Sequence, residues 1–281
     1  MVVPTVGRPR YLEGCLAALA RVDTPQGGFE VVVVNDGGGE AIERVVGGAG
    51  LDARLVAPPR TGPSAARNAG AATARGRHVA FTDDDCEPRR EWLLELERAL
   101  AGAPGAAAGG ITLNGAPRST GAAASQVVVD SLHTQFNRDP AFPRFFASQN
   151  LAVPAEDFRE IGGFDESFRY GEDREFCERW LRRGHRFVTA PAAVVDHMRI
   201  LGLAEFWRQH HGYGRGARAF ARSRGAGGRG EDTGGVLRGL AAETRRTGSA
   251  RVAAYVALSQ LATATGYARE LLSPWRAPGG P

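Results

Sequence analysis

The chain has 281 residues, of which 43% are hydrophobic and 23% charged, a balance that suits one large α/β domain and argues against disorder throughout. The formal net charge is +4, and since the chain contains no Lys, its positive side chains are Arg. The excess lies in residues 199–230, which carry seven Arg and one Glu. No apolar run reaches the roughly 18 residues that span a bilayer, and the first residues do not resemble a signal peptide.

The chain has three cysteines, Cys15, Cys86 and Cys177. Their number is odd and their spacing is not that of a metal site. Cys15 and Cys177 fall on apolar helical positions, which predicts buried free thiols. A reducing, cytoplasmic compartment is therefore expected.

The first part of the chain alternates strand and helix patterns. Residues 1–4 predict a short strand, and Pro9 opens a helix whose apolar residues recur at helical spacing. Val31–Val34 form an all-apolar run, which is typical of a strand buried on both faces of a parallel sheet. Residues 54–57 predict the third strand.

Small residues dominate the next helix, for which Ser64 is the predicted N-cap and Gly76 the stop. A fourth strand over residues 78–81 follows, and then a helix whose apolar stripe begins at Trp92. This order predicts an α/β fold with a mostly parallel, doubly wound sheet flanked by helices.

The second half predicts fewer strands and more helix. A strand is expected around residues 110–113, with loops between residues 115 and 148, and Gly184 ends a helix with an apolar stripe. The chain after Arg199 has a helical pattern with Gly-rich breaks, and residues 251–272 predict a final helix. Residues 1–200 are accordingly expected to form the main domain, and residues 201–281 a helical, Arg-rich C-terminal extension.

Acidic side chains follow two of the predicted strands at the point where each strand ends. Asp36 follows the second strand, and Asp83, Asp84 and Asp85 follow the fourth. Ligands of such sheets bind beyond the carboxyl ends of the strands, and carboxylates together with substrate phosphates commonly hold Mg²⁺ or Mn²⁺. Because alternate side chains of an extended segment point opposite ways, Asp83 and Asp85 are expected to differ in role, with Asp84 only shaping the turn.

An ordered series of motifs over residues 2–200 resembles family 2 glycosyltransferases: PTVGRP, VVNDGG, GPSAARNAG, FTDDD, SQNLAVP, GGFDESF, GEDREF and VVDH. The order makes the series specific, where a single motif is not. The resemblance implies the nucleotide-sugar-binding A-type fold and transfer of a sugar from a nucleotide-diphosphate sugar to an acceptor hydroxyl. The first strand begins earlier than in such enzymes, so a start upstream of Met1 is an alternative.

The resemblance implies contacts to the donor nucleotide. Asp36 would hold the nucleobase, with Thr5 and Arg8 bordering the same pocket. Arg67 would approach the base or the phosphates, and Asp83 the ribose or the outer shell of a metal ion.

The same resemblance implies the reacting end of the site. Asn150 is expected near the sugar, and Asp85 and His197 are the expected ligands of Mn²⁺ or Mg²⁺. Glu172 and Asp173 match the acidic pair on the acceptor side, with Asp173 as the general base of inverting members. Because Asp173 lies at a predicted helix N-terminus, it is expected to stay ionised.

The implied reaction is chemically consistent. A carboxylate would take the proton of the acceptor hydroxyl while the diphosphate, activated by a metal, leaves from the opposite face of the sugar. Simpler interpretations stay open for single residues: Asp36 as a turn residue of NDGG, Glu172 and Asp173 as helix N-terminal acids, and His197 as a hydrogen-bonded side chain.

Other classes of protein are also open. A sugar nucleotidyltransferase shares the general architecture, but PTVGRPRY is a poor phosphate loop. A receiver-like phosphoacceptor domain needs a Lys, which the chain lacks. A non-catalytic sugar-nucleotide-binding protein would carry similar acids.

The Arg-rich segment over residues 207–230 interleaves aromatic residues with its charges. A solvated basic face, an anionic membrane surface or a lipid-linked acceptor fits it, whereas nucleic acid is disfavoured because no nucleic-acid motif is present. The helix over residues 251–272 is expected to pack on the domain or to pair in a homodimer. Expected partners are thus the donor and a glycan, lipid-linked or small-molecule acceptor, in the cytoplasm or at the inner face of the membrane.

Overall fold

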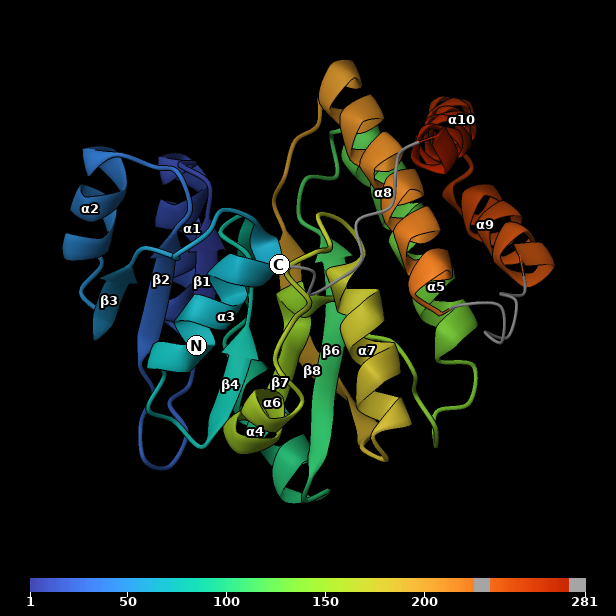
Figure 1. Ribbon diagram of the computed structural model, residues 1–281. Coiled ribbons are helices and arrows are strands. Elements are labelled where there is room, and N and C mark those ends of the chain that lie inside the picture. Colours follow the sequence, from blue (N-terminus) through green and yellow to red (C-terminus); the bar gives the residue numbers. More distant parts are fainter. Residues whose placement is uncertain (225–232, 273–281) are drawn as a thin grey trace.

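The computed structural model describes residues 1–224 and 233–272, in which one β-sheet carries helices on both faces (Figure 1). The strands are β1 (Val2–Thr5), β2 (Val31–Asn35), β3 (Ala53–Val56), β4 (His78–Phe81), β5 (Cys86–Pro88), β6 (Ala106–Asn114), β7 (Leu151–Pro154) and β8 (Arg186–His197). The helices are α1 (Pro9–Leu19), α2 (Glu40–Gly47), α3 (Pro63–Thr73), α4 (Trp92–Ala101), α5 (Thr120–Phe136), α6 (Ala155–Glu160), α7 (Glu172–Arg182), α8 (Leu203–Ser223), α9 (Thr233–Thr247) and α10 (Ala250–Leu272), with a 3-10 turn, η1 (Ser148–Asn150).

The strands lie in the order β3-β2-β1-β4-β7-β6-β8-β5. β3, β2, β1 and β4 run parallel to one another, as do β6 and β8. β7 is antiparallel to β4 and β6, and the edge strand β5 is antiparallel to β8. The predicted mostly parallel sheet flanked by helices is therefore confirmed, with β7 and β5 as its antiparallel members.

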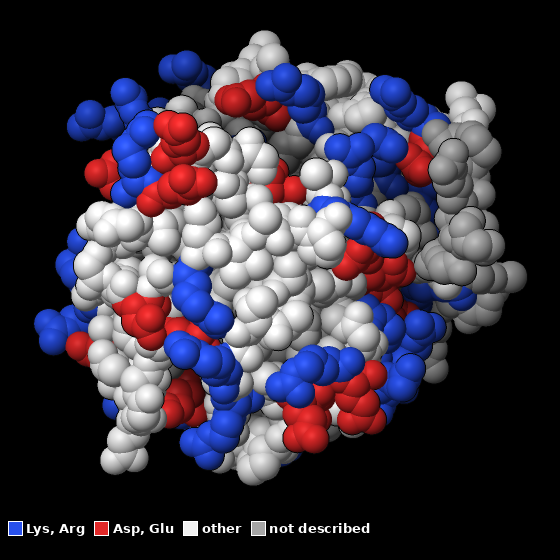
Figure 2. Space-filling model, turned by 60° about the vertical axis from the view of Figure 1, so that its left-hand side comes forward, with Lys and Arg blue, Asp and Glu red and all other residues white. Residues whose placement is uncertain are grey.

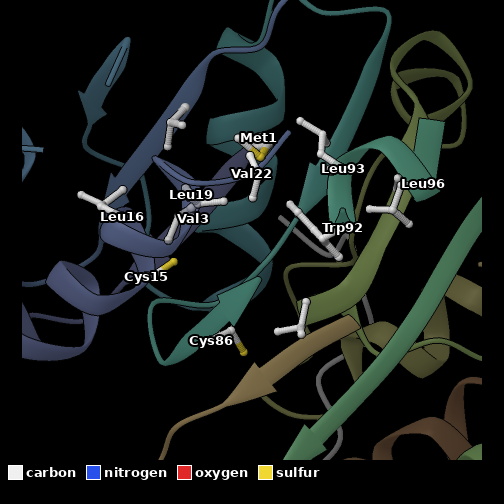
Figure 3. Close-up of a cluster of buried hydrophobic side chains, with 14 of the residues drawn as sticks. Met1, Val3, Cys15, Leu16, Leu19, Val22, Cys86, Trp92, Leu93 and Leu96 are labelled. Carbon is white, nitrogen blue, oxygen red and sulfur yellow. The ribbon is translucent and has the colours of Figure 1, made fainter. Parts of the chain in front are cut away.

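Alternation along β2 explains why its sequence is apolar throughout. Val31 and Val33 belong to the core under α1 and α4, and Val32 and Val34 belong to the core on the other face, with α3, α6 and α7. Figure 3 shows the first core, where side chains of α1 meet those of α4 across Met1 and Val3. A strand covered on both faces has no solvent side on which a polar residue would be favoured.

Two local predictions are wrong at helix ends and loops. Ser64 is not an N-cap, because α3 begins at Pro63 and its cap is Gly62, whose φ of 125° favours glycine. The region expected to be loop contains α5, which Ser119 caps by accepting a hydrogen bond from the Ala122 N–H at 3.2 Å. The small residues that begin α5 hide its periodicity.

The C-terminal helices form a layer at one end of the sheet (Figure 1). Apolar residues of α5, α8, α9 and α10 share a third core, so the extension packs on the domain through α5. The final helix predicted over residues 251–272 is confirmed as α10. Within the described ranges, none of the helices has both the length and the apolar character needed to cross a membrane. The boundary after residue 200 stays a prediction.

Several Arg residues of the extension are neutralised within the molecule. Arg215 and Arg222 lie beside Glu270, with Arg215 at 2.9 Å, and Arg224 lies 3.1 Å from Glu178. On the face shown in Figure 2, basic and acidic side chains are interspersed around an uncharged area. These pairs reduce the positive field expected from composition alone.

Candidate active site

Parallel strands bring the predicted donor residues to one edge of the sheet. Thr5 ends β1 opposite Asn35 of β2, and the acidic triplet directly follows β4. From the other half of the sheet, the last residue of β8, His197, pairs with Cys86 of β5. The backbone N–H of Met198 also donates to the Asp85 carbonyl at 2.8 Å. The sheet thus brings motifs that are distant in the sequence together in a single site.

Asp84 is wholly buried and carries an ion pair, so the prediction that it only shapes the turn is wrong. Its Oδ2 accepts hydrogen bonds from Thr5 Oγ1 at 2.6 Å and from Arg8 Nε at 3.2 Å, and Arg8 Nη2 pairs with Oδ1. Burial raises the pKa of Asp84 to about 6, and the neighbouring Asp85 adds to this, whereas Arg8 opposes it. Thr5 and Arg8, expected beside the nucleobase, therefore anchor the acidic triplet.

Asp85 is surrounded by the side chains of Arg8, His197 and Arg199. Its Oδ2 accepts from Arg8 Nη1 at 2.6 Å and lies 3.8 Å from Arg199 Nη1, and its Oδ1 lies 3.4 Å from His197 Nε2. Burial acts to raise the pKa of Asp85, but the hydrogen bond and charge of His197 and the charges of Arg8 and Arg199 outweigh it. The pKa of Asp85 is therefore held below its usual value, and the carboxylate is ionised.

A divalent cation fits these residues. Asp85, Cys86 and His197 place one potential ligand atom each within 4.8 Å of one another. A carboxylate oxygen and an imidazole nitrogen are both ligands that Mn²⁺ accepts. Burial raises the pKa of the Cys86 thiol well above its ordinary value, which leaves it protonated and unsuited to a hard cation. Asp85 and His197 are the fitting pair.

Arg67 joins the donor side of the site to the acceptor side. Its buried guanidinium donates from Nη2 to Asp83 Oδ1 at 2.7 Å and from Nη1 to Glu172 Oε1 at 2.9 Å. It therefore connects α3, the acidic triplet and the N-terminus of α7. Glu172 is thereby an ion-pair partner of Arg67, whereas its neighbour Asp173 accepts a hydrogen bond from a backbone N–H.

Asp173 does not behave as a simple helix N-terminal acid. Its Oδ1 accepts a hydrogen bond from the Arg174 N–H at 2.8 Å. Burial raises the pKa of Asp173 to about 7, and the charge of Glu172 adds to this, while Arg67 and Arg174 oppose it. The expectation that the helix N-terminus keeps it fully ionised is therefore wrong, because burial beside a second carboxylate outweighs the helix dipole.

Asp36 keeps one carboxylate oxygen free. Its Oδ2 accepts from the Gly62 N–H at 2.7 Å, whereas its Oδ1 is buried and has no hydrogen-bond partner among residues 1–224 and 233–272. The turn at this position is closed instead by Asn35, whose side chain both donates to and accepts from the Gly38 backbone at 2.6 Å. This unpaired oxygen of Asp36 can accept one more hydrogen bond.

Asn150, expected near the sugar, has a structural role in this fold. Its Nδ2 donates to the Ile111 and Ala193 carbonyls, both at 3.0 Å, and its Oδ1 accepts from the Trp92 indole at 2.8 Å. These bonds hold β6, β8 and α4 together at the register shift between Gly109 and Ile111. Its side chain is committed to the core.

Two further residues at the site are missed by the motif comparison. Arg199 lies beside Asp85, and its only signal is its position two residues after His197. Tyr213 comes from α8, and the charges of Asp173 and Asp85 contribute to the raised pKa of its phenol. Gly216 of α8 packs against Gly171, which precedes Glu172, so the extension lies beside the acceptor-side acids.

Solved structures of glycosyltransferases share this architecture. A mannosyltransferase from Pyrobaculum calidifontis, in complex with GDP-Man and Mn²⁺, aligns over 96% of this chain and 86% of its own, with a TM-score of 0.68 and 18% identity. TarS of S. aureus aligns over 95% of this chain and 53% of its own, with a TM-score of 0.54 and 16% identity. The fold is that of A-type glycosyltransferases.

The family follows from the sequence match. The model of Glycosyl transferase family 2 matches residues 1–158, and the chain belongs to that family. A pre-mycofactocin glycosyltransferase from Mycobacterium tuberculosis is 29% identical over 211 residues, which are 73% of this chain and 45% of the relative. Glycosyltransferase AglE from Haloferax volcanii is 26% identical over 202 residues, which are 70% of this chain and 66% of the relative. The chain spans about half to two thirds of the length of these curated relatives.

Proposed function

We propose that this chain is a metal-dependent, inverting glycosyltransferase that moves a sugar from a nucleotide-diphosphate sugar to an acceptor hydroxyl. The observation that carries the proposal is the double ion pair of Arg67 with Asp83 and Glu172. It fixes the acids of the donor side and the acids of the acceptor side at opposite ends of one guanidinium. A reaction between a bound donor and an approaching acceptor needs both sets of groups held in one site.

The donor end is supported by the chemistry of three residues. The unpaired oxygen of Asp36 would accept a hydrogen bond from a nucleobase or ribose, and Asp85 with His197 would hold Mn²⁺ or Mg²⁺. When bound, that cation would neutralise charge on the diphosphate as it leaves. The Mn²⁺ and GDP-Man of the Pyrobaculum calidifontis structure support this assignment.

Asp173 is the proposed general base. It takes the proton of the acceptor hydroxyl, whose oxygen attacks the anomeric carbon as the bond from that carbon to the diphosphate breaks on the opposite face. A base with a pKa near 7 is well matched to a hydroxyl that loses its proton only in the transition state. Arg67 holds Glu172 away from this proton transfer, and Arg199 lies where it can meet the departing diphosphate.

A thermal-shift screen tests the proposal. The protein is heated with ADP, CDP, GDP, UDP and dTDP and with common sugar derivatives of each, with and without MnCl₂. The proposal expects at least one nucleotide to raise the melting temperature only when Mn²⁺ is present. Equal melting temperatures in every condition would contradict the donor class, and a nucleotide effect that ignores Mn²⁺ would contradict the metal.

A further inference from the structure

Helix α8 presses against the segment that carries the proposed base. Gly212 and Gly216, one turn apart on α8, face Tyr170, and a Cβ on Gly212 would overlap the Tyr170 ring. A Cβ on Gly216 would lie too close to the Tyr170 carbonyl, and Gly171 also approaches Gly216. Because Gly171 immediately precedes Glu172 and Asp173, this contact fixes α8 beside the acceptor-side acids.

Tyr213 lies between these two glycines in the chain. Its ring packs edge-on against buried His210, with ring centroids 5.2 Å apart, and His210 in turn contacts Ser125 Oγ at 3.1 Å. This packing orients the ring, yet 42% of the residue is exposed. In the part of the chain that the structure describes, no hydrogen-bond partner satisfies its hydroxyl. An oriented aromatic ring with an open face and a free hydroxyl suits the binding of a small polar ligand.

The packing of α8 against Tyr170 and Gly171 places Tyr213 beside the acceptor-side acids, and the charges around its phenol agree with this position. Its dense protein surroundings are the main cause of a raised pKa, and the carboxylates of Asp173, Glu172 and Asp85 raise it further, whereas Arg199 lowers it. These carboxylates include the proposed base, Asp173, and the proposed metal ligand, Asp85. The Tyr213 hydroxyl is protonated at neutral pH and can donate a hydrogen bond.

We propose that Tyr213 contacts the transferred sugar of the donor, holding it by ring stacking and by a hydrogen bond from the hydroxyl. The inference rests on the proposed function, in which the diphosphate lies at Asp85 and the acceptor at Asp173. The sugar being transferred is bonded to the first group and attacked by the second, so it lies between them. A neutral hexose, with apolar C–H faces and hydroxyl acceptors, has the chemistry that this ring and this hydroxyl recognise.

Calorimetry separates sugar binding from nucleotide binding. Dissociation constants are measured in MnCl₂ for GDP against GDP-mannose and for UDP against UDP-glucose. Tyr213→Ala is expected to raise the dissociation constant of the nucleotide-sugar about tenfold or more, while that of the matching diphosphate stays within about twofold. Tyr213→Phe, which keeps the ring, is expected to raise the dissociation constant of the nucleotide-sugar about threefold. The control is Tyr267→Ala, which removes an exposed tyrosine of α10 that packs against Arg218 of α8.

Each outcome of these titrations decides a different point. Unchanged nucleotide-sugar affinity in Tyr213→Ala overturns the inference, as does an equal loss for diphosphate and nucleotide-sugar, which would indicate a structural effect. A loss in Tyr267→Ala as large as that in Tyr213→Ala overturns it as well. If the wild-type protein binds none of the diphosphates of the thermal-shift panel in MnCl₂, the proposed function fails first, and the inference that rests on it falls too.

Discussion

The Nε2 atom of His197 lies 3.4 Å from the Oδ1 atom of Asp85, where the last residue of β8 meets the segment before β5. Ligand atoms on adjacent positions around an octahedral cation lie about 3 Å apart when each metal–ligand bond is about 2.1 Å. The two atoms are therefore almost at the separation that a shared cation requires. Antiparallel pairing of β5 with β8 produces this arrangement between two residues that are distant in the sequence.

Removal of either proposed ligand should abolish the response to Mn²⁺. A cation at a hundred times its dissociation constant stabilises a folded protein by about 2.7 kcal/mol, which raises the melting temperature by several degrees. We expect His197→Ala and Asp85→Asn to lose this rise in thermal-shift measurements with MnCl₂. Cys86→Ala is the control, because a protonated thiol should not bind the ion, and it should keep the rise. A full Mn²⁺ response in His197→Ala would place the metal elsewhere.

The rate of sugar transfer should increase with pH around neutrality. A general base acts only when it has lost its proton, and the pKa of Asp173 is about 7. The turnover rate at saturating substrate should therefore rise about tenfold per pH unit below 7 and level off above 7. Initial rates between pH 5.5 and 8.5, with nucleotide-diphosphate release as the readout, measure this profile. A flat rate across this range would assign the base to another group.

Asp173→Asn provides the matched variant. The amide keeps the shape of the side chain and cannot accept the proton, so transfer should fall by about 10²- to 10⁴-fold. Donor binding in Mn²⁺ should be unchanged, because Asp173 lies on the acceptor side of the site. Near-normal turnover of this variant would contradict its assignment as the base.

The periodicity of apolar residues predicted the sheet and most of its helices. Elements such as β2 and α4 pack against apolar neighbours, and their own buried positions are therefore apolar. It failed for α5, which begins with the small residues TGAAAS and packs there without large side chains. The cap of α3 was also missed. A glycine at position 62 permits a positive φ but does not require one, so the sequence does not reveal this backbone conformation.

Residue types predicted the acids of the site, but not which of them face a ligand. Asp84 is inside the protein because Thr5 and Arg8 approach it from the end of β1, a contact between distant segments. Asn150 is inside because Gly110 leaves room for its amide at the register shift of β6. Tyr213 lies outside the matched motifs, and only the packing of α8 on Tyr170 reveals its position.

The close crossing of α8 and α10 should depend on two glycines. A Cβ on Gly214 would overlap the Thr263 carbonyl, and a Cβ on Gly266 would overlap the His211 carbonyl. Backbone atoms cannot move aside as a flexible side chain can, so either change to Ala should reduce the free energy of unfolding by about 1–3 kcal/mol or more. Urea unfolding followed by circular dichroism measures the loss.

Gly239→Ala is the control for these two variants. Gly239 lies in helix α9, and the nearest atoms to its added Cβ would be 3.8 Å away, on Ser131. Alanine is favoured over glycine inside a helix by about 0.5–1 kcal/mol, so this variant should be slightly more stable than the wild type. Destabilisation by Gly239→Ala equal to that of Gly214→Ala would show that helix packing is not the cause.

Burial of His210 should make the folded state less stable in mild acid. The residue is fully buried, and burial lowers its pKa to about 4, below the ordinary value of 6.5. Because the folded pKa is the lower one, the stabilising contribution of the neutral ring is complete above about pH 6.5 and declines as the pH falls towards 4. The full decline is up to about 3 kcal/mol. His210→Asn, whose amide can still reach Ser125, removes this titration, so the stability difference between wild type and variant should narrow from pH 7.5 to pH 5 in urea unfolding. A constant difference across that range would mean that the ring does not titrate on unfolding.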